Sequence, residues 1–297
     1  MTWIALATYR TSAKGEAPAV VVDNKLYDAR QALPAGVGGA IADWPRAQAA
    51  VRQLAEQVRA GKLPALREGM DALTAPYRPM RVFCAAANYI EHAKEMGTVL
   101  ANKAQSKPYM FLKLQDTIVG PGDDVVKPPE TQKLDWEVEL AAVIGKQARR
   151  VGVDEALDYV AGYSVLNDIS ARDLNKRTDY PFAFDWFQGK SWDTFAPFGP
   201  WIVPAWQVKD PQALGLKLTV NGKVMQDSST ASMIWTVREQ VSYLSQILTL
   251  RPGDVIATGT PTGVGAAHGI FLKDGDRVEA TVEGIGTLPN RIVNEKR

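Results

Sequence analysis

The sequence predicts an α+β protein in which strands predominate and a small unit precedes a larger body. Short apolar runs recur between turn signals, whereas the predicted helices are fewer and do not alternate regularly with them. Regular alternation would instead favour a doubly wound sheet. At 297 residues the chain is long enough for a small domain plus a larger one. We therefore expect residues 1–75 to form a small α+β domain and residues 76–297 to form a mostly-β body.

The small unit is predicted to contain a hairpin followed by a helix. Segments 2–10 and 19–30 are rich in strand-forming residues, and Asp23-Asn24 is a typical turn pair. Apolar residues near helical spacing predict a helix over 44–60. The segment 73–80 contains two prolines and is expected to be the linker to the body.

The body is predicted to consist mainly of strands separated by tight turns. Its turn signals are the sequences GPGDD, VNGK, LRPGD and LKDGD. Helices are expected over only three stretches, which are 89–96, 154–159 and 234–248. The chain shows no internal repeat and no low-complexity tract.

Composition excludes several classes of function. The formal net charge is +1 with no basic stripe, so we expect no nucleic acid and no anionic membrane surface as a partner. No apolar run approaches the roughly 20 residues that span a bilayer, and the first residues do not resemble a signal peptide. The single cysteine excludes an intramolecular disulfide and a cysteine-based zinc site. These features favour a cytoplasmic protein.

Three carboxylates indicate a candidate metal site. In the run LDWEVELAAVIG, Glu137 and Glu139 fall on alternate residues after Asp135, so on a strand both point to one face. Two neighbouring carboxylates entering an apolar strand repel each other and lose hydration unless a cation neutralises them. Asp168 ends a second apolar run, and an all-oxygen set of this kind suits Mg²⁺ or Mn²⁺. The alternative is a solvated edge strand, with Asp168 in an ordinary turn.

Histidine and lysine supply further candidates. His92 and Glu95 are three residues apart, which on a helix places them on one face and lets the carboxylate orient the imidazole. The alternative is a surface helix whose side chains face water. Lys190 lies among aromatic residues, so it is either a desolvated amine aimed at an anionic substrate or a salt-bridged structural lysine. The second histidine, His268, is expected in a loop, and the lone Cys84 is expected in a buried strand.

Two glycine-containing segments differ from the nucleotide-binding motifs that they partly match. The sequence GKS at 189–191 lacks the upstream glycine of a P-loop, and GVGAAHG at 263–269 has its last glycine one position too late for a dinucleotide fingerprint. Both nucleotide-binding motifs are therefore excluded. The overlapping sequence TGTPTGVG, residues 258–265, has two interpretations. Its backbone N–H groups hold a substrate oxyanion, or it is a plain connecting loop.

Taken together, six ordered segments between about residues 80 and 290 resemble the fumarylacetoacetate hydrolase family. They are CAAANYIEHAKE, PYMFLKLQDTIVGPGD, LDWEVELAAVIGK, VAGYSVLNDISARDL, WFQGKSWDTFAPFGP, and VNGKVMQDSSTASM with LRPGDVIATGTPTGVG. The resemblance implies a mixed β-roll or β-sandwich body, a divalent cation (Mg²⁺ or Mn²⁺) and a homodimer. It makes Glu137, Glu139 and Asp168 the metal ligands.

The resemblance also implies roles for other residues. His92 and Glu95 would activate water, Lys190 would be the active-site lysine, and Arg172 and Thr260 would contact the substrate's carboxylate or oxo groups. The resemblance also makes Asn175 a substrate-binding residue; the family commonly has glutamine there, and the asparagine side chain is one methylene shorter in its reach to the oxo acid.

The implied substrate is a small oxo acid. We expect hydrolytic cleavage of a carbon–carbon bond in an acylpyruvate-type 1,3-dicarbonyl acid, in which an enolate leaves. The alternatives are decarboxylation of an oxaloacetate-like β-keto acid, or isomerisation or hydration of a 2-oxo-alkenoate. A third reading, a metal-stabilised scaffold without activity, remains open. Tyr89, Trp186, Phe187 and Trp192 either line the acyl pocket or belong to the core.

Overall fold

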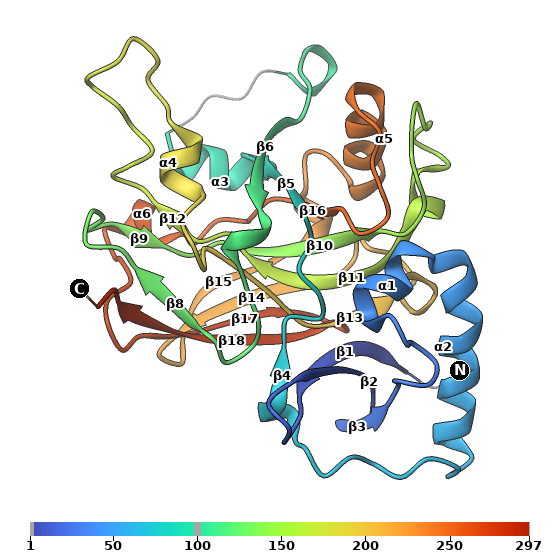
Figure 1. Cartoon of the computed structure of the whole chain (residues 1–297). Coiled ribbons are helices and arrows are strands. Elements are labelled where there is room, and N and C mark those ends of the chain that lie inside the picture. The colour runs from blue at the N-terminus through green and yellow to red at the C-terminus, as the bar shows by residue number, and fades with distance from the viewer. Residues whose placement is uncertain (1–2, 98–101, 297) are drawn as a thin grey trace.

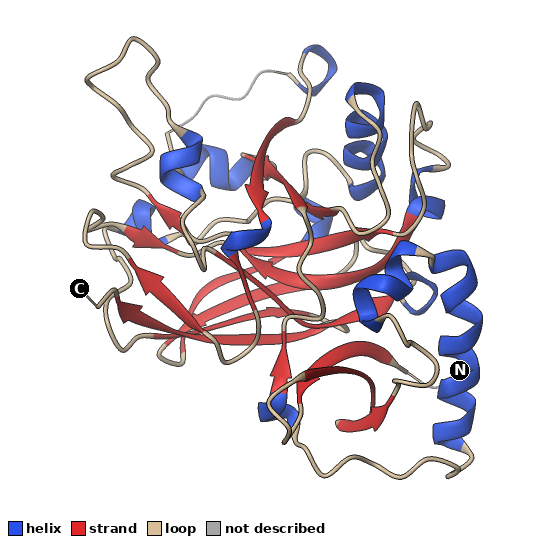
Figure 2. Ribbon diagram, in the orientation of Figure 1, coloured by secondary structure: helices blue, strands red, loops and turns tan. Residues whose placement is uncertain are grey.

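The computed structural model describes residues 3–97 and 102–296 (Figure 1). Strands predominate over helices, and the α+β, mostly-β class predicted from the sequence is confirmed (Figure 2). The described helices are α1 (Gly36–Ala42), α2 (Trp44–Arg59), α3 (Ile90–Glu95), α4 (Trp186–Lys190), α5 (Val237–Ile247) and α6 (Gly265–His268). Among the described residues, no helix is both long enough and apolar enough to cross a membrane.

A large sheet runs through the centre of the molecule. Its main path is β3 (Lys25–Asp28), β2 (Glu16–Val22), β1 (Ala5–Arg10), β13 (Ala196–Pro204), β11 (Val160–Asn167), β10 (Val138–Ile144), β16 (Val255–Ala257), β5 (Arg81–Ala86) and β6 (Tyr109–Leu114). Two short strands lie off this path, β4 (Leu73–Thr74) beside β1 and β7 (Ile118–Val119) beside β13.

A five-stranded sheet packs against one face of the large sheet. It consists of β15 (Lys223–Ser229), β14 (Gly215–Val220), β17 (Arg277–Val282), β18 (Gly286–Asn294) and β8 (Asp124–Lys127). A separate pair, β9 (Leu134–Asp135) and β12 (Ser170–Ala171), lies at the ends of β10 and β11 (Figure 1). Side chains of both large layers, such as Leu140 and Leu218, form one apolar core between them.

Strand β10 is buried on both faces, which explains its continuous apolar sequence. Leu140 and Ala142 face the five-stranded sheet, whereas Ala141 and Val143 belong to a second core that also contains Val51 of α2. A strand covered on both sides has no solvated face for polar residues, so apolar residues do not alternate with polar ones. The acidic residues at its start are therefore confined to the strand end.

The N-terminal segment is joined to the body through the large sheet. Leu6 of β1 pairs with Ile202 of β13, and the helices α1 and α2 cover this end of the sheet (Figure 1). Proline at the first turn starts α2, and its apolar face contributes Val51 and Leu54 to the second core. The domain boundary at residue 75 stays a prediction.

Several local predictions need correction. The turn Asp23-Asn24 joins β2 to β3 rather than the first two strands, and both residues have positive φ, as a two-residue hairpin turn requires. The predicted helix over 154–159 is a short 3₁₀ turn, Ala156–Tyr159. Helix α1 was not predicted. The helices predicted over 44–60, 89–96 and 234–248 correspond to α2, α3 and α5 within a few residues.

Candidate metal and proton-transfer site

Three carboxylates meet where β10 and β11 end side by side. Glu137 precedes β10, Glu139 is its second residue, and Asp168 directly follows β11. The two strands are antiparallel, with Val138 opposite Asn167, so the start of one meets the end of the other. The Asp168 amide donates to the Glu137 carbonyl at 2.9 Å. One oxygen of each carboxylate lies within 4.8 Å of the others, and all three residues are buried. We call these three residues the carboxylate cluster.

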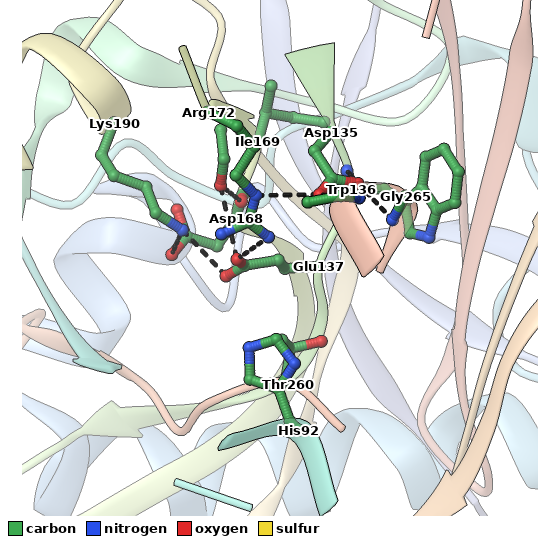
Figure 3. A network of polar contacts seen from close by, with 12 residues as sticks. His92, Asp135, Trp136, Glu137, Asp168, Ile169, Arg172, Lys190, Thr260 and Gly265 are labelled. Atoms are coloured by element: carbon green, nitrogen blue, oxygen red, sulfur yellow. Dashed lines mark hydrogen bonds and ion pairs between the residues drawn. The ribbon is translucent and has the colours of Figure 1, made fainter. Parts of the chain in front are cut away.

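Two buried lysines, Lys190 (Figure 3) and Lys113, neutralise part of this cluster. Lys190, at the end of α4, donates to Glu137 Oε2 and Asp168 Oδ2, each at 2.8 Å. Lys113 of β6 forms an ion pair with Asp168 and donates to the carbonyls of Ile169 and Phe195 at 2.9 and 2.6 Å. Both lysine side chains are essentially inaccessible to solvent. Lys190 is therefore salt-bridged, which is the second of the two readings offered by the sequence.

The members of the cluster differ in charge environment. Burial alone would raise the pKa of Glu137, but Lys190 and Arg172 outweigh it and lower the pKa to about 2. Burial raises the pKa of Glu139 well above its ordinary value, and the negative charges of Asp168 and Glu137 raise it further. The amide of Gly259 donates to Glu139 Oε2 at 2.7 Å, which only partly offsets these effects. Glu139 is therefore the cluster member with the least compensation from cationic side chains.

The cluster fits a hard divalent cation. Its ligand atoms are all carboxylate oxygens, they converge from two strands, and they are removed from bulk water. Burial opposes the ionised form of Glu139, and a cation would relieve this. Among the described residues, neither histidine nor cysteine belongs to the cluster, so the oxygen set suits Mg²⁺ or Mn²⁺ better than Zn²⁺.

Arg172 lies beside the cluster and bridges two carboxylates. Its Nε donates to Asp135 Oδ2 at 2.8 Å, and its Nη2 donates to Glu137 Oε1 at 2.5 Å (Figure 3). The guanidinium is thus engaged by protein carboxylates, although the family resemblance assigns it to the substrate. Both carboxylate oxygens of Glu137 are held by cations, because Lys190 binds the other one.

The two candidate proton-transfer residues lie on one face of α3, as their spacing predicts. His92 Nδ1 lies 3.3 Å from Glu95 Oε2, and the His92 side chain is buried. Burial would raise the pKa of Glu95, but hydrogen bonds from His92 and from the Gly263 amide lower it overall. His92 also interacts electrostatically with Glu137, which places the imidazole close to the carboxylate cluster (Figure 3). The surface-helix alternative does not hold for His92.

The Gly-rich loop, residues 258–265, binds protein carboxylates through its N–H groups. The amide of Gly259 donates to Glu139, that of Gly263 to Glu95 at 2.9 Å, and that of Gly265 to Asp135 at 2.6 Å. These groups were candidates for holding a substrate oxyanion, and the structure uses them instead to fix three acidic side chains. Gly263 has φ of 100° and lies against the backbone of residue 225, so a side chain there would be strained.

Of two further residues that the family resemblance assigns to the substrate, Thr260 has internal hydrogen-bond partners and Asn175 has an unpaired side-chain oxygen. The Thr260 hydroxyl donates to the Val138 carbonyl and accepts from Gln226 Nε2, each at 2.9 Å. Asn175 is buried, and its Oδ1 has no hydrogen-bond partner among the described residues. This amide packs directly against Gly189, where an added Cβ would lie 1.6 Å from Oδ1. Gly189 is therefore required for the approach of Asn175 to α4.

The second histidine, the cysteine and the aromatic candidates lie outside the carboxylate cluster. His268 is the last residue of α6 rather than a loop residue, and its Nε2 lies 3.5 Å from Glu95 Oε1. Cys84 is buried in β5, as predicted. Tyr89 is buried in the core, whereas Phe187 is 70% exposed and Trp186 stacks on aromatic neighbours.

Sequence reasoning missed three residues that organise the site, Lys113, Asp135 and Gln226. A lysine in an edge strand usually faces solvent, so nothing in the sequence around Lys113 marked it as buried. Asp135 was noticed beside Glu137, but its partners are loop amides about 130 residues away. The sequence pattern that could have marked Asp135 as a site residue is its place in the alternating run of acidic residues 135, 137 and 139.

The chain is similar in sequence and in structure to known proteins. The family model "Fumarylacetoacetate (FAA) hydrolase C-terminal" matches residues 81–293. The human protein "Oxaloacetate tautomerase FAHD2A, mitochondrial" is 40% identical over 247 residues, which are 82% of this chain and 76% of that protein. A solved fumarylacetoacetate hydrolase from Exiguobacterium antarcticum is 34% identical with a TM-score of 0.82, and the match covers 98% of this chain and 100% of that one.

A second solved structure contains ligands. The fumarylpyruvate hydrolase from Pseudomonas aeruginosa, in complex with Mn²⁺ and pyruvate, is 36% identical with a TM-score of 0.65 over 72% of this chain and 90% of that one. The matched family model covers well over half of the described body, including the carboxylate cluster, His92 and Lys190. The chain therefore belongs to the fumarylacetoacetate hydrolase family.

Proposed function

We propose that this chain is a divalent-metal-dependent enzyme that catalyses keto–enol tautomerisation of an oxaloacetate-type dicarboxylic oxo acid. One observation carries the proposal: a buried histidine paired with a carboxylate lies next to a buried all-oxygen cluster suited to a cation. A base and a cation site in one place are what the removal of a proton next to a carbonyl requires.

The relatives support this reading over carbon–carbon hydrolysis. The human relative is named an oxaloacetate tautomerase, and its similarity extends over most of this chain. This favours the oxaloacetate alternative offered by the sequence, with proton transfer in place of decarboxylation. The Pseudomonas aeruginosa hydrolase was solved with Mn²⁺ and pyruvate, so an oxo acid and a divalent cation are both compatible with the family. We propose Mg²⁺ or Mn²⁺ for this chain.

The metal would be held by Glu137, Glu139 and Asp168, and when bound it would polarise the substrate carbonyl and stabilise negative charge on its oxygen. Lys190 lies between two of these carboxylates, where its ammonium adds positive charge next to the reacting acid. Lys113 holds Asp168 from the other side and does not reach solvent. These two lysines keep the three carboxylates together despite their mutual repulsion.

His92 is the proposed base. Its Nδ1 faces Glu95, so a neutral imidazole that donates its Nδ1 proton keeps a lone pair on Nε2. Nε2 would take a proton from the methylene carbon next to the carbonyl, and the electron pair of that C–H bond would form the C=C bond of the enol. The same proton returns to the carbonyl oxygen. No water is consumed and no carbon–carbon bond breaks.

Hydrolysis of an acylpyruvate is the second candidate, favoured by the Pseudomonas aeruginosa fumarylpyruvate hydrolase. The same His92 would then remove a proton from water, whose oxygen attacks the distal carbonyl and expels an enolate. Glu95 would stabilise the resulting imidazolium in either reaction. The two functions differ in their products and not in the residues they require.

Product analysis separates these functions. The purified chain with Mn²⁺ is incubated in D₂O with either the enol form of oxaloacetate or acetylpyruvate. Tautomerisation predicts rapid loss of enol absorbance, deuterium at the methylene carbon and intact oxaloacetate. Decarboxylation predicts pyruvate and carbon dioxide, and hydrolysis predicts acetate and pyruvate from acetylpyruvate. No acceleration of enol loss over the metal-only control would refute the proposal.

Assembly and compartment also remain proposals. We infer a homodimer without nucleic-acid or membrane partners from the family resemblance and the nearly neutral charge. Light scattering on the purified chain tests the dimer. The single cysteine is consistent with a reducing compartment such as the cytoplasm, and the human relative is named as mitochondrial.

A further inference from the structure

We propose that Asp135 is a positioning residue of the metal site, which acts by holding Arg172 against Glu137. The inference rests on the metal-dependent function proposed above. Asp135 is fully buried at the end of β9, two residues before the first member of the carboxylate cluster. It is not one of the three carboxylates that could share a cation.

The carboxylate of Asp135 is saturated by protein donors. Oδ1 accepts from the amides of Trp136 at 2.8 Å and Gly265 at 2.6 Å. Oδ2 accepts from the Ala266 amide at 3.0 Å and from Arg172 Nε at 2.8 Å. A carboxylate offers about four acceptor positions, so Asp135 has none left for a substrate or a metal. Any influence on the metal site must pass through one of its partners.

Arg172 is the partner that reaches the carboxylate cluster. Its guanidinium is planar, so fixing Nε on Asp135 also fixes the direction in which Nη2 meets Glu137. Glu137 is held on its other oxygen by Lys190. The orientation of this prospective ligand is therefore set from two sides, and Asp135 controls one of them.

Asp135 also balances charge. The guanidinium is shared between the carboxylates of Asp135 and Glu137, so Asp135 offsets part of its positive charge. In Asp135→Asn the whole charge would bear on Glu137 and would compete with a divalent cation for that carboxylate. Substitutions of residues that orient metal ligands typically weaken metal affinity by about 10- to 100-fold.

The first test measures Mn²⁺ affinity, from the electron paramagnetic resonance signal of free Mn²⁺, in the full chain. Asp135→Asn should weaken binding by about tenfold. Asp173→Asn is the matched control, because Asp173 accepts hydrogen bonds from Thr131 and Gln132, and none joins it to the cluster among the described residues. The control should bind Mn²⁺ within about twofold of the wild type. Unchanged affinity in Asp135→Asn would overturn the proposal.

The second test asks whether the effect passes through Arg172. Asp135→Asn is introduced into an Arg172→Met chain, where the proposal predicts no further change in Mn²⁺ affinity. A further loss would show that Asp135 acts through the Gly265 amide instead, and would overturn the proposal. This comparison uses only the Arg172→Met chain and the double variant, so it does not depend on the folding of Asp135→Asn alone.

These measurements are independent of the reaction. A wild-type chain that does not bind Mn²⁺ would overturn the proposed function together with this inference. A wild-type chain that binds Mn²⁺ but fails to tautomerise oxaloacetate would overturn only the proposed function. The dependence on Asp135 would still be read from the Mn²⁺ affinities of the wild type and the four variants.

Discussion

The carboxylate cluster and the His92–Glu95 pair lie next to each other but are stabilised in different ways. The cluster is held by cationic side chains, Lys113, Lys190 and Arg172, that come from other elements. Glu95 is held by its own helix neighbour, His92, and by a loop amide. One region therefore depends on charge compensation in a low-dielectric interior, and the other on uncharged hydrogen-bond donors: a neighbour in the same helix and a loop amide distant in sequence.

The difference implies that the carboxylate cluster serves metal binding and stability, whereas the His92–Glu95 pair serves proton transfer. A cluster that already carries three neighbouring cations can stay folded without a metal, so its side chains are arranged before a cation arrives. The His92–Glu95 pair contributes little to that framework and can be changed without disturbing it. Substitutions in the two regions should therefore separate chemistry from metal binding and stability.

The largest expected effect comes from His92→Asn. Loss of the base should lower the turnover of the preferred oxo acid by about 10³-fold, a typical contribution of general acid–base catalysis. Mn²⁺ affinity should stay within about twofold, because none of the three carboxylates is altered. Steady-state kinetics and a Mn²⁺ titration check both outcomes. Undiminished turnover would remove His92 from the mechanism.

The next effect concerns the framework. Lys113→Met leaves Asp168 with one cation fewer and removes a donor from the carbonyls of Ile169 and Phe195, of which the second keeps the Ile169 amide. Removing one partner of a buried ion pair should lower the free energy of unfolding of the metal-free chain by about 3 kcal/mol. Urea unfolding measures this loss. Saturating Mn²⁺ should restore more stability to the variant than to the wild type, since binding to the folded state stabilises it.

Lys103→Met is the matched control for this experiment. Lys103 pairs with Glu239 at 2.7 Å, but its side chain is 45% exposed. An exposed pair contributes at most about 1 kcal/mol, so the control should unfold almost like the wild type. Equal stabilities of the two variants would show that the buried position of Lys113 gives it no special role.

The contrast also explains how much could be read from the sequence. The alternation of Glu137 and Glu139 and the strand end at Asp168 are local patterns, and they correctly brought the three carboxylates together. The spacing of His92 and Glu95 on one helix was equally local. Strand predominance followed from the apolar runs and turn signals.

What could not be read depends on pairing between distant segments. Lys113 meets Asp168 only because β6 and the end of β11 converge in the fold. The sequence of the Gly-rich loop predicts amides that can bind an anion, but it does not identify the anion. The amides bind Glu95, Asp135 and Glu139 because the fold brings these distant residues to the loop. Likewise, the pairing of β1 with β13 joins residues about 200 positions apart and leaves no periodic signal.

A third prediction uses the opposite charge environments of two cluster members. The pKa of Glu139 is raised above its ordinary value of 4.5. Its contribution to the stability of the fold is therefore present below pH 4.5 and is lost as the pH rises. Gln cannot ionise, so metal-free Glu139→Gln should become more stable than the wild type as the pH rises above 4.5. Thermal unfolding across pH measures this, and added Mn²⁺ should remove the advantage.

Glu137→Gln is the matched comparison of opposite sign. The pKa of Glu137 is lowered to about 2. Its contribution to the stability of the fold is therefore present above pH 4.5 and is lost as the pH falls towards 2. Metal-free Glu137→Gln should therefore be less stable than the wild type near neutral pH, and the difference should shrink in acid. Parallel behaviour of the two variants would mean that Lys190 and Arg172 do not distinguish the two carboxylates.

The smallest effect is expected from His268→Gln, which tests whether the proton-transfer region ends at Glu95. His268 lies 3.5 Å from Glu95 but is 53% exposed, and Glu95 also accepts the Gly263 amide at 2.9 Å. An exposed pair of this kind contributes at most about 1 kcal/mol, so turnover should fall by less than about fivefold. A loss as large as that of His92→Asn would show that both histidines of the chain act on one carboxylate. The proton-transfer region would then be a three-residue unit that depends on α6 as well as on α3 and the Gly-rich loop.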